Sequence, residues 1–238
     1  MKYYTIDGPE LIHGQELHDG LNNAKLPVYL THDGYSGGIN FAKEDVLALM
    51  YMGDELFEVD PVSSVFESKC EPHLFRSNDV ILKRVGSVRE NIKFLVEQGA
   101  NVHVWYDVPL INAAHKNDFE LVRFFVERGA DVNAWRGLPL LRALENQNFT
   151  MAKYLIENGA NIEESNEPLI NAVLRRDLAS VKFLIRQGAT GNILYALRLA
   201  VEQNAAEIVL FLIKDTIECD FEFKNLIEKK FQSMVGTC

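Results

Sequence analysis

The segment VRFFVERGADVNAWRGLPLLRAL, residues 122–144, decides the fold because the chain repeats most of it about thirty residues later. The second copy, AKYLIENGANIEESNEPLINAV, covers residues 152–173. Both copies carry an apolar run, a Gly-Ala pair and a Pro-Leu pair in the same order. Self-similarity at a fixed period is the signature of a repeat architecture. The sequence therefore predicts a stack of similar structural units.

Two dipeptides fix the period of these units. The Gly-Ala pairs begin at Gly99, Gly129, Gly159 and Gly188, and the Pro-Leu pairs begin at Pro109, Pro139 and Pro168. Extending the same spacing in both directions gives five units, at about 79–97, 109–127, 139–157, 168–186 and 196–214. Each unit is predicted to be two short helices, because Pro suits the first turn of a helix and Gly permits the left-handed backbone that ends one.

Two kinds of side chain recur at positions that we expect to be buried. A small residue follows each first-helix leucine, at Ala113, Ala143, Ala172 and Ala200. An aromatic residue heads the apolar triplet of each second helix, at Phe94, Phe124, Tyr154, Phe183 and Phe211. Helices of about ten residues are not stable alone in water. We therefore expect these aromatic side chains to pack between neighbouring units and to hold the stack together.

The segments GADVNAWRGLPLLRAL (129–144) and HKNDFELVRFFVERGADVN (115–133) resemble the ankyrin repeat, and the resemblance covers roughly residues 76–214. It implies a curved stack of antiparallel helix pairs with projecting hairpin fingers, which this family uses to bind other proteins. The family's Thr-Pro-Leu-His appears as Val-Pro-Leu-Ile at 108–111 and as Leu-Pro-Leu-Leu at 138–141. The units are also about three residues shorter than the common 33. Because the loss lies between Gly and Pro, we expect stubby finger loops.

The first 75 residues do not repeat, and their charge differs from that of the rest. They hold 13 Asp and Glu against 4 Lys and Arg, whereas residues 76–238 hold 21 against 20. We therefore place a domain boundary between 75 and 76. The segment 25–41 mixes β-forming residues with turn signals, 44–53 is expected to be a helix and 54–60 a strand. A small α+β domain is predicted.

This N-terminal region also resembles the leader domain of many ankyrin proteins of giant DNA viruses of amoebae, which are mimivirus-like. The matching residues are the Gly-Leu-Asn at 20–22, the Gly-Gly-Ile-Asn-Phe at 37–41 and the predicted strand before Pro61. The resemblance implies no activity for this domain.

The C-terminal end of the stack is expected to need a cover. Four units place a basic residue six positions before the Gly position, at Lys93, Arg123, Lys153 and Lys182, but the fifth unit has Leu210. Solenoids need terminal caps with a polar outer face. Residues 220–235, DFEFKNLIEKKFQSMV, are therefore predicted to form a cap helix, with a frayed tail as the alternative.

Composition excludes several classes of partner. The net charge is −10, whereas nucleic-acid binding depends on Lys and Arg that neutralise phosphates; we expect no nucleic-acid partner and no membrane partner. The three cysteines lie far apart without a zinc-binding spacing. No signal peptide and no long apolar run is evident. These features predict a cytoplasmic protein, with host-cell cytoplasm or a virion as further possibilities, and no cofactor or metal.

Few residues suggest catalysis. His13, His18, Asp19, His32 and Asp33 lie in the N-terminal domain, where a metal or acid–base site is conceivable. Polar residues are expected in turns, however, and nearness in the sequence does not by itself indicate a site. Ser36 lies near glycines but outside the strand–Ser–helix context of a nucleophile elbow. We predict no catalytic residue.

The candidate binding residues lie in the repeats. Trp105 and Trp135 each precede a Pro by four residues, so we expect them one above the other on adjacent finger loops, followed by Tyr106 and Arg136. Exposed Trp is a typical hot-spot residue, although the two could instead stiffen the short loops. Polar residues on the first helices, Asn112, Arg142 and Asn171, face the concave side in this family.

We therefore predict a mainly α protein, an ankyrin-repeat α-solenoid preceded by a small α+β domain. Its expected function is non-enzymatic binding of a partner protein, as an adaptor that is itself a monomer. Two alternatives stay open: an enzymatic or metal-binding N-terminal domain whose repeats recruit substrate, and a self-assembling or virion structural protein.

Overall fold

The computed structural model describes residues 3–7, 20–23, 29–31, 34–36, 39–42, 46–51, 55–67, 74–163, 168–189, 191 and 193–215. Its contacts divide the chain into two compact units. The first unit comprises Met1–Ala113 and Arg123–Ala130, and the second comprises Ala114–Val122 and Asp131–Cys238.

The first unit contains a seven-stranded antiparallel sheet. Its strands run in the order β2-β9-β6-β1-β5-β8-β7. Their bounds are β1 Tyr3–Asp7, β2 Gly20–Asn23, β5 Ile39–Ala42, β6 Glu55–Pro61, β7 Phe66–Glu67, β8 Leu74–Ser77 and β9 Asp79–Ser87. Strands β3 (Tyr29–Thr31) and β4 (Gly34–Ser36) pair as a separate hairpin. The small sheets predicted at the N-terminus are confirmed, including the strand expected at 54–60. The helix expected at 44–53 is a short 3₁₀ helix, η2, Val46–Tyr51.

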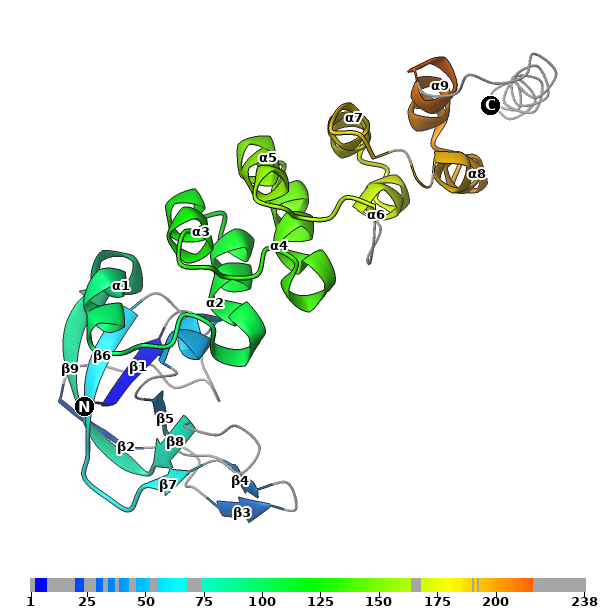
Figure 1. Cartoon of the computed structure of the whole chain (residues 1–238). Coiled ribbons are helices and arrows are strands. Elements are labelled where there is room, and N and C mark those ends of the chain that lie inside the picture. Colours follow the sequence, from blue (N-terminus) through cyan, green and yellow to red (C-terminus); the bar gives the residue numbers. More distant parts are fainter. Residues whose placement is uncertain are drawn as a thin grey trace. The chain divides into compact units, whose positions relative to one another are not determined.

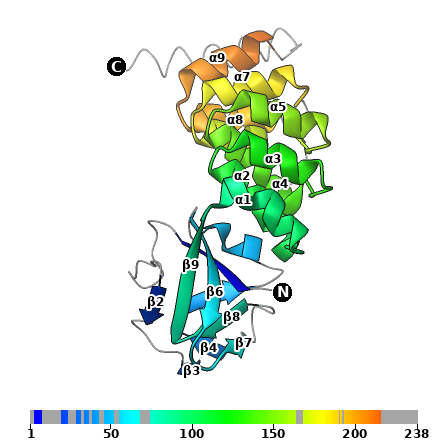
Figure 2. The ribbon, with the colours of Figure 1, turned by 90° about the vertical axis from the view of Figure 1, so that its left-hand side faces the viewer.

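The strands alternate between a buried face and an exposed face. Buried side chains of β5, β6 and β9 form one core cluster, which comprises Phe41, Phe57, Val59, Val80 and Leu82. The neighbouring residues in the chain, such as Asp60 and Ile81, point to the exposed face, where Ile81 is 47% accessible. Figure 2 shows β6 and β9 side by side in this sheet.

The first predicted unit, 79–97, is wrong in its first half. Residues 79–87 are a strand that pairs with both β2 and β6. The reason is local: Val80 and Leu82 are buried whereas Ile81 and Lys83 are exposed, which is the two-residue period of a strand. The predicted boundary at 75/76 falls inside the same sheet, because β8 and β9 both belong to it.

The helices follow this sheet in chain order. They are α1 Val88–Glu97, α2 Val104–His115, α3 Phe119–Val126, α4 Ala134–Glu145, α5 Phe149–Glu157, α6 Pro168–Leu174, α7 Leu178–Arg186, α8 Ile193–Glu202 and α9 Ala206–Asp215. Helix α1 begins at Ser87, whose hydroxyl accepts a hydrogen bond from the Glu90 amide at 3.2 Å. It packs on β6 and β9.

In the second unit, helices α4 to α9 lie near three of the positions that the period predicts, while the number of repeats stays a prediction. In the second unit α4 packs on α5, α6 on α7 and α8 on α9, and successive first helices also contact each other (Figure 1). Gly129, Gly159 and Gly188 have φ between 85° and 95°, which confirms their expected role in ending a helix. The four alanines of the first helices are at most 5% exposed. The predicted cap, residues 220–235, lies outside the described residues, and Leu210 is 52% exposed.

The expected burial of the aromatic residue that heads each triplet holds for Phe124, which is 8% exposed, but not for the other four. Phe94 is 39% exposed, and Tyr154, Phe183 and Phe211 are only half-buried. The residue that follows the aromatic one is fully buried in every unit: Leu95, Phe125, Leu155, Leu184 and Leu212 are at most 1% exposed. A helix turns by 100° per residue, so the position pointing into the pair is one residue later than predicted.

Two of these aromatic residues, Tyr154 and Phe183, pack between neighbouring repeats of the second unit, as expected. Phe119 meets Tyr154 edge-on with ring centroids 5.5 Å apart, and Phe149 stacks on Phe183 at 5.0 Å. These half-buried contacts are inter-repeat contacts outside the central core.

Each helix pair is joined by a residue in left-handed backbone that is not glycine. The φ angles lie between 53° and 58° at Asn117, Gln147, Arg176 and Asn204. Side chains with a Cβ resist this conformation, at about 1–2 kcal/mol per residue. Neighbouring interactions hold the turn: the Asn148 amide donates to Asn117 Oδ1 at 2.7 Å, and Arg176 donates to the Gln203 carbonyl.

Replacing Leu95 with Ala should lower the free energy of unfolding by about 3 kcal/mol, because it empties a fully buried site. Replacing Phe94 with Ala should cost about 1 kcal/mol, because that ring is partly solvated. Urea denaturation of the full chain, followed by circular dichroism, measures both. A larger loss for Phe94→Ala would restore the aromatic residue as the core position.

Replacing Gln147 with Gly should raise the free energy of unfolding by about 0.5–1 kcal/mol, because Gly relieves the left-handed strain at a small entropic cost. The matched control is Lys153→Gly in the middle of α5, which should lose about 1 kcal/mol. Thermal and urea denaturation check both signs. A destabilised Gln147→Gly would show that the Gln side chain itself holds the turn.

Candidate interaction surface

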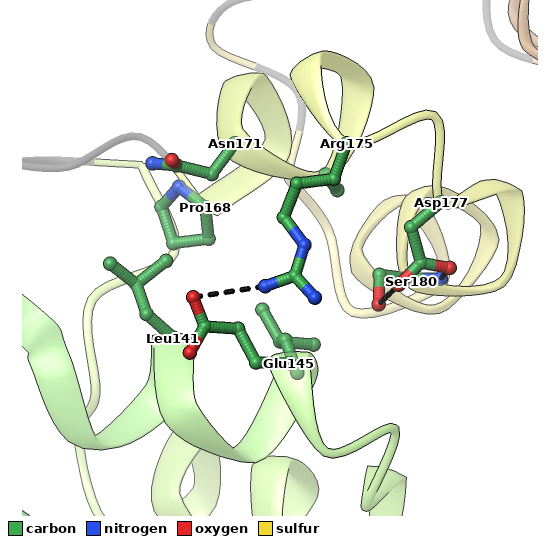
Figure 3. Close-up of a pocket in the computed structure, with 9 residues that line it drawn as sticks. Leu141, Glu145, Pro168, Asn171, Arg175, Asp177 and Ser180 are labelled. Carbon is green, nitrogen blue, oxygen red and sulfur yellow. Dashed lines mark hydrogen bonds and ion pairs between the residues drawn. The ribbon is translucent and has the colours of Figure 1, made fainter. Parts of the chain in front are cut away.

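A groove lies between the first helices α4 and α6 in the second unit (Figure 3). It contains a cavity of about 30 Å³. Its lining comprises Leu141, Leu144 and Glu145 from α4, Pro168, Asn171 and Ala172 from α6, and Arg175, Asp177 and Ser180 from the following turn and α7. A volume of this size holds roughly two water molecules or the tip of a small aliphatic side chain.

One of the lining residues is smaller than its counterparts in three other units. Ser180 is 1% exposed and occupies the position that Leu121, Met151 and Ile208 hold in the other units. Its hydroxyl donates to Asp177 Oδ2 at 2.7 Å, and its amide donates to Asp177 Oδ1 at 3.1 Å. Asp177 is thereby the N-cap of α7.

Ion pairs cross the rim of the groove. Arg142 Nη1 lies 2.7 Å from Glu145 Oε2, and Arg175 Nη1 lies 2.9 Å from Glu145 Oε1. In Figure 3 the Arg175 side chain reaches towards Glu145, between Pro168 and Leu141 on one side and Asp177 and Ser180 on the other. All three charged side chains are 34–46% exposed. The network thus links two repeats and remains open to solvent.

The finger loops are left-handed turns, which the sequence did not predict. Trp105, Tyr106 and Asp107 have φ angles of 51°, 58° and 63°. In the next repeat Trp135 and Arg136 have φ angles of 50° and 63°, with Gly137 at 79°. The Gly137 amide donates to the Asn133 carbonyl at 2.9 Å and closes the second turn. The stubby loop expected from the shortened period is therefore a single left-handed helical turn.

Side chains hold these strained turns in place. His103 Nδ1 lies 2.7 Å from Asp107 Oδ1, and Asp107 is only 8% exposed. Asn133 donates through Nδ2 to the Gly159 carbonyl at 2.9 Å, and its Oδ1 accepts from the Asn161 amide at 2.8 Å. Asn133 therefore ties one finger turn to the loop of the following repeat.

The turns present aromatic and charged groups to solvent. Tyr106 is 83% exposed and Trp135 is 57% exposed, and Arg136 is also exposed, whereas Trp105 is half-buried. The expected placement of Trp105 above Trp135 stays a prediction, because the two belong to different compact units. The exposure of Trp135 favours presentation over internal packing.

The polar first-helix residues predicted to bind a partner do not all lie in the same compact unit. Arg142 and Asn171 both lie at the groove, Arg142 through its ion pair and Asn171 in the lining. Asn112 is half-buried on α2, in the other compact unit. Three residues of the site were missed: Glu145, Arg175 and Ser180. Ser180 could have been found from the sequence, because the equivalent positions of other units hold large apolar residues, Leu121, Met151 and Ile208.

The residues weighed for catalysis are not tested by this structure. His13, His18, Asp19, His32 and Asp33 lie outside the described residues. Among the residues that are described, no group of three or more His, Cys, Asp or Glu is placed to hold a metal ion. Within the same ranges, no helix has the length and apolar character needed to cross a membrane.

Comparison with known protein families agrees with the helix pairs. Residues 82–166 match the family model described as ankyrin repeats (3 copies). The matched segment begins within β9 and extends past α5. Over this segment the chain is therefore similar to ankyrin repeats, which are generally protein-interaction modules. A comparison with curated proteins found no match.

Replacing Asn133 with Ala should lower the free energy of unfolding by about 2 kcal/mol, because it removes both hydrogen bonds to the following loop. The control is Asn158→Ala, whose amide bonds only within its own helix turn and should cost clearly less. Urea denaturation compares the two. Equal losses would mean that the link between loops adds nothing.

Proposed function

We propose that the chain is a non-enzymatic adaptor that binds a partner protein through the finger turns and the first-helix face of its repeats. The observation that carries the proposal is the exposure of Tyr106 and Trp135 on backbone that is strained yet held by named contacts. Strain of this kind persists where the surroundings fix it and is common at binding sites. Exposed aromatic side chains and arginine are also the residues enriched at interface hot spots.

The finer parts of the proposal follow from the sequence. The resemblance of the N-terminal region to giant-virus leader domains makes a host-cell protein the expected partner, met in the cytoplasm. We further propose that the adaptor works as a monomer, which the mass in solution at several concentrations would test.

Capture experiments test the binding surface. The full-length chain is immobilised and incubated with lysate of the cells in which it is naturally made, and retained proteins are quantified by mass spectrometry. A Tyr106→Ala, Trp135→Ala double variant should retain the main partner at least about tenfold less, since each hot spot contributes about 2 kcal/mol.

The control is Lys153→Ala, an exposed residue of the second helix α5, which should capture the partner as well as the parent chain does. The thermal midpoint of the double variant should stay within about 2 °C of the parent. A large drop in that midpoint would mark the aromatic residues as structural. Undiminished capture would place the interface elsewhere.

A further inference from the structure

The residue that ends α5 differs in its chemistry from the equivalent residues of the other repeats. The Gly of each Gly-Ala pair is preceded by Gln98, Arg128, Asn158 or Gln187, and Asn158-Gly159 is the one Asn-Gly pair in the sequence. The main-chain nitrogen of such a pair can attack the side-chain amide, because Gly has no Cβ to hinder the approach. The five-membered ring that results closes far more readily than the six-membered ring that Gln would give. Asn158 is therefore the position most open to spontaneous chemical change.

The reaction that an Asn-Gly pair undergoes is deamidation. The Gly159 nitrogen forms a bond to Cγ of Asn158, the Cγ–Nδ2 bond breaks, and the amide proton of Gly159 leaves with the departing ammonia. Water then opens the resulting succinimide ring at either of its two carbonyl groups. One opening gives Asp. The other gives isoaspartate, in which the main chain runs through the former side chain and is one atom longer.

In the folded chain the end of α5 holds the reacting atoms apart. The Gly159 amide donates to the Ile156 carbonyl at 3.0 Å. Asn158 Nδ2 donates to the Tyr154 carbonyl at 2.8 Å. The ψ angle of Asn158 is 15°, at which the Gly159 nitrogen is turned away from the side chain that it would attack. Ring closure therefore requires the last turn of α5 to open.

The surroundings leave room for that opening. Asn158 and Gly159 are exposed, and apart from the chain neighbours no heavy atom lies within 4 Å of the place where a Cβ on Gly159 would stand. Ends of helices open more easily than a protein unfolds as a whole. A hydrogen bond from the preceding repeat opposes the opening, because Asn133 Nδ2 donates to the Gly159 carbonyl at 2.9 Å. The contact that ties the Trp135 finger turn to the following loop thus also restrains the reactive pair.

Neither product fits the end of the helix as Asn158 does. The Asp product places a carboxylate, which only accepts, where Nδ2 now donates to the Tyr154 carbonyl. Both products add a negative charge at the C-terminal end of a helix, where the helix dipole disfavours it, and next to Glu157. The longer main chain of isoaspartate also moves the Gly159 carbonyl relative to Asn133. Deamidation therefore loosens the link between two repeats.

We propose that Asn158 is a deamidation site controlled by the opening of the end of α5, and that its conversion weakens the link between the Trp135 finger turn and the following repeat. Because the loss of ammonia is not reversed, the site accumulates a record of how often this helix end has opened. The reaction needs no binding partner, so its outcome is independent of the adaptor role.

Mass spectrometry of the full chain tests the site. The chain is incubated at mildly alkaline pH, either folded or in guanidinium chloride, and Asp and isoaspartate at position 158 are quantified after digestion at acidic pH. In the unfolded chain Asn158 should convert before any other Asn or Gln. In the folded chain it should convert at least about tenfold more slowly, which corresponds to about 1.4 kcal/mol for opening the helix end. Equal rates, or no conversion of Asn158 in the unfolded chain, would overturn the assignment.

Two variants separate local opening from global unfolding. Asn133→Ala removes the hydrogen bond to the Gly159 carbonyl and should speed the conversion in the folded chain at least about threefold. Leu212→Ala empties a fully buried site on α9, away from α5, and should leave the rate unchanged although it lowers stability. Circular dichroism confirms that both variants are folded. An unchanged rate in Asn133→Ala, or an equal acceleration in both variants, would overturn control by the end of α5.

The consequence of the conversion is tested with a matched variant that cannot react in this way. Asn158→Gln carries the residue found at Gln98 and Gln187, which end their helices with similar backbone angles, so it should fold. The parent chain, converted in denaturant and then refolded, should lose about 2–4 °C in its thermal midpoint, whereas Asn158→Gln treated in the same way should lose nothing. Asn158→Asp should show part of the loss without any treatment. An unchanged midpoint in the converted parent, or an equal loss in Asn158→Gln, would refute the proposed weakening.

Discussion

One buried side chain in each second helix supports the rest of the repeats. Leu155, Leu184 and Leu212 are fully buried in the second unit, each on a helix too short to be stable alone. The stacked pairs fix both ends of every connecting segment, and this is what allows Trp135, Arg136 and other residues with a Cβ to remain in left-handed backbone. Core packing in the helices therefore determines the conformation of the exposed turns.

The same packing explains why the repeats differ locally. The residue equivalent to Met151 is large and apolar in most units. In one unit it is Ser180, a smaller residue whose hydroxyl donates a hydrogen bond to Asp177. The Arg175–Glu145 pair then links the two first helices across the opening. Ser180 therefore lies in the lining of a small cavity whose rim carries this ion pair.

The sequence predicted the helix pairs well, because a spacing of 29–30 residues between glycines constrains where helices end. It misplaced the first unit, since counting residues backwards ignored the alternation at Val80 and Leu82 that makes β9 a strand. The sequence analysis also predicted that Phe94, and not Leu95, is the buried residue, because the larger side chain was expected to lie in the core. Three candidate site residues could be predicted because they stand at equivalent positions of successive repeats: Arg142, Asn171 and the exposed Trp135. The left-handed turns could not, because Trp and Arg give no signal for positive φ.

The placement of the tryptophans has a practical consequence. The chain has two tryptophans, Trp105 and Trp135, and both lie on the finger turns instead of in the helix cores. Intrinsic indole emission therefore reports the state of these turns and is nearly blind to the sheet and to the helix interiors. Tryptophan fluorescence of the unlabelled chain can therefore report conformational change or binding at the finger turns.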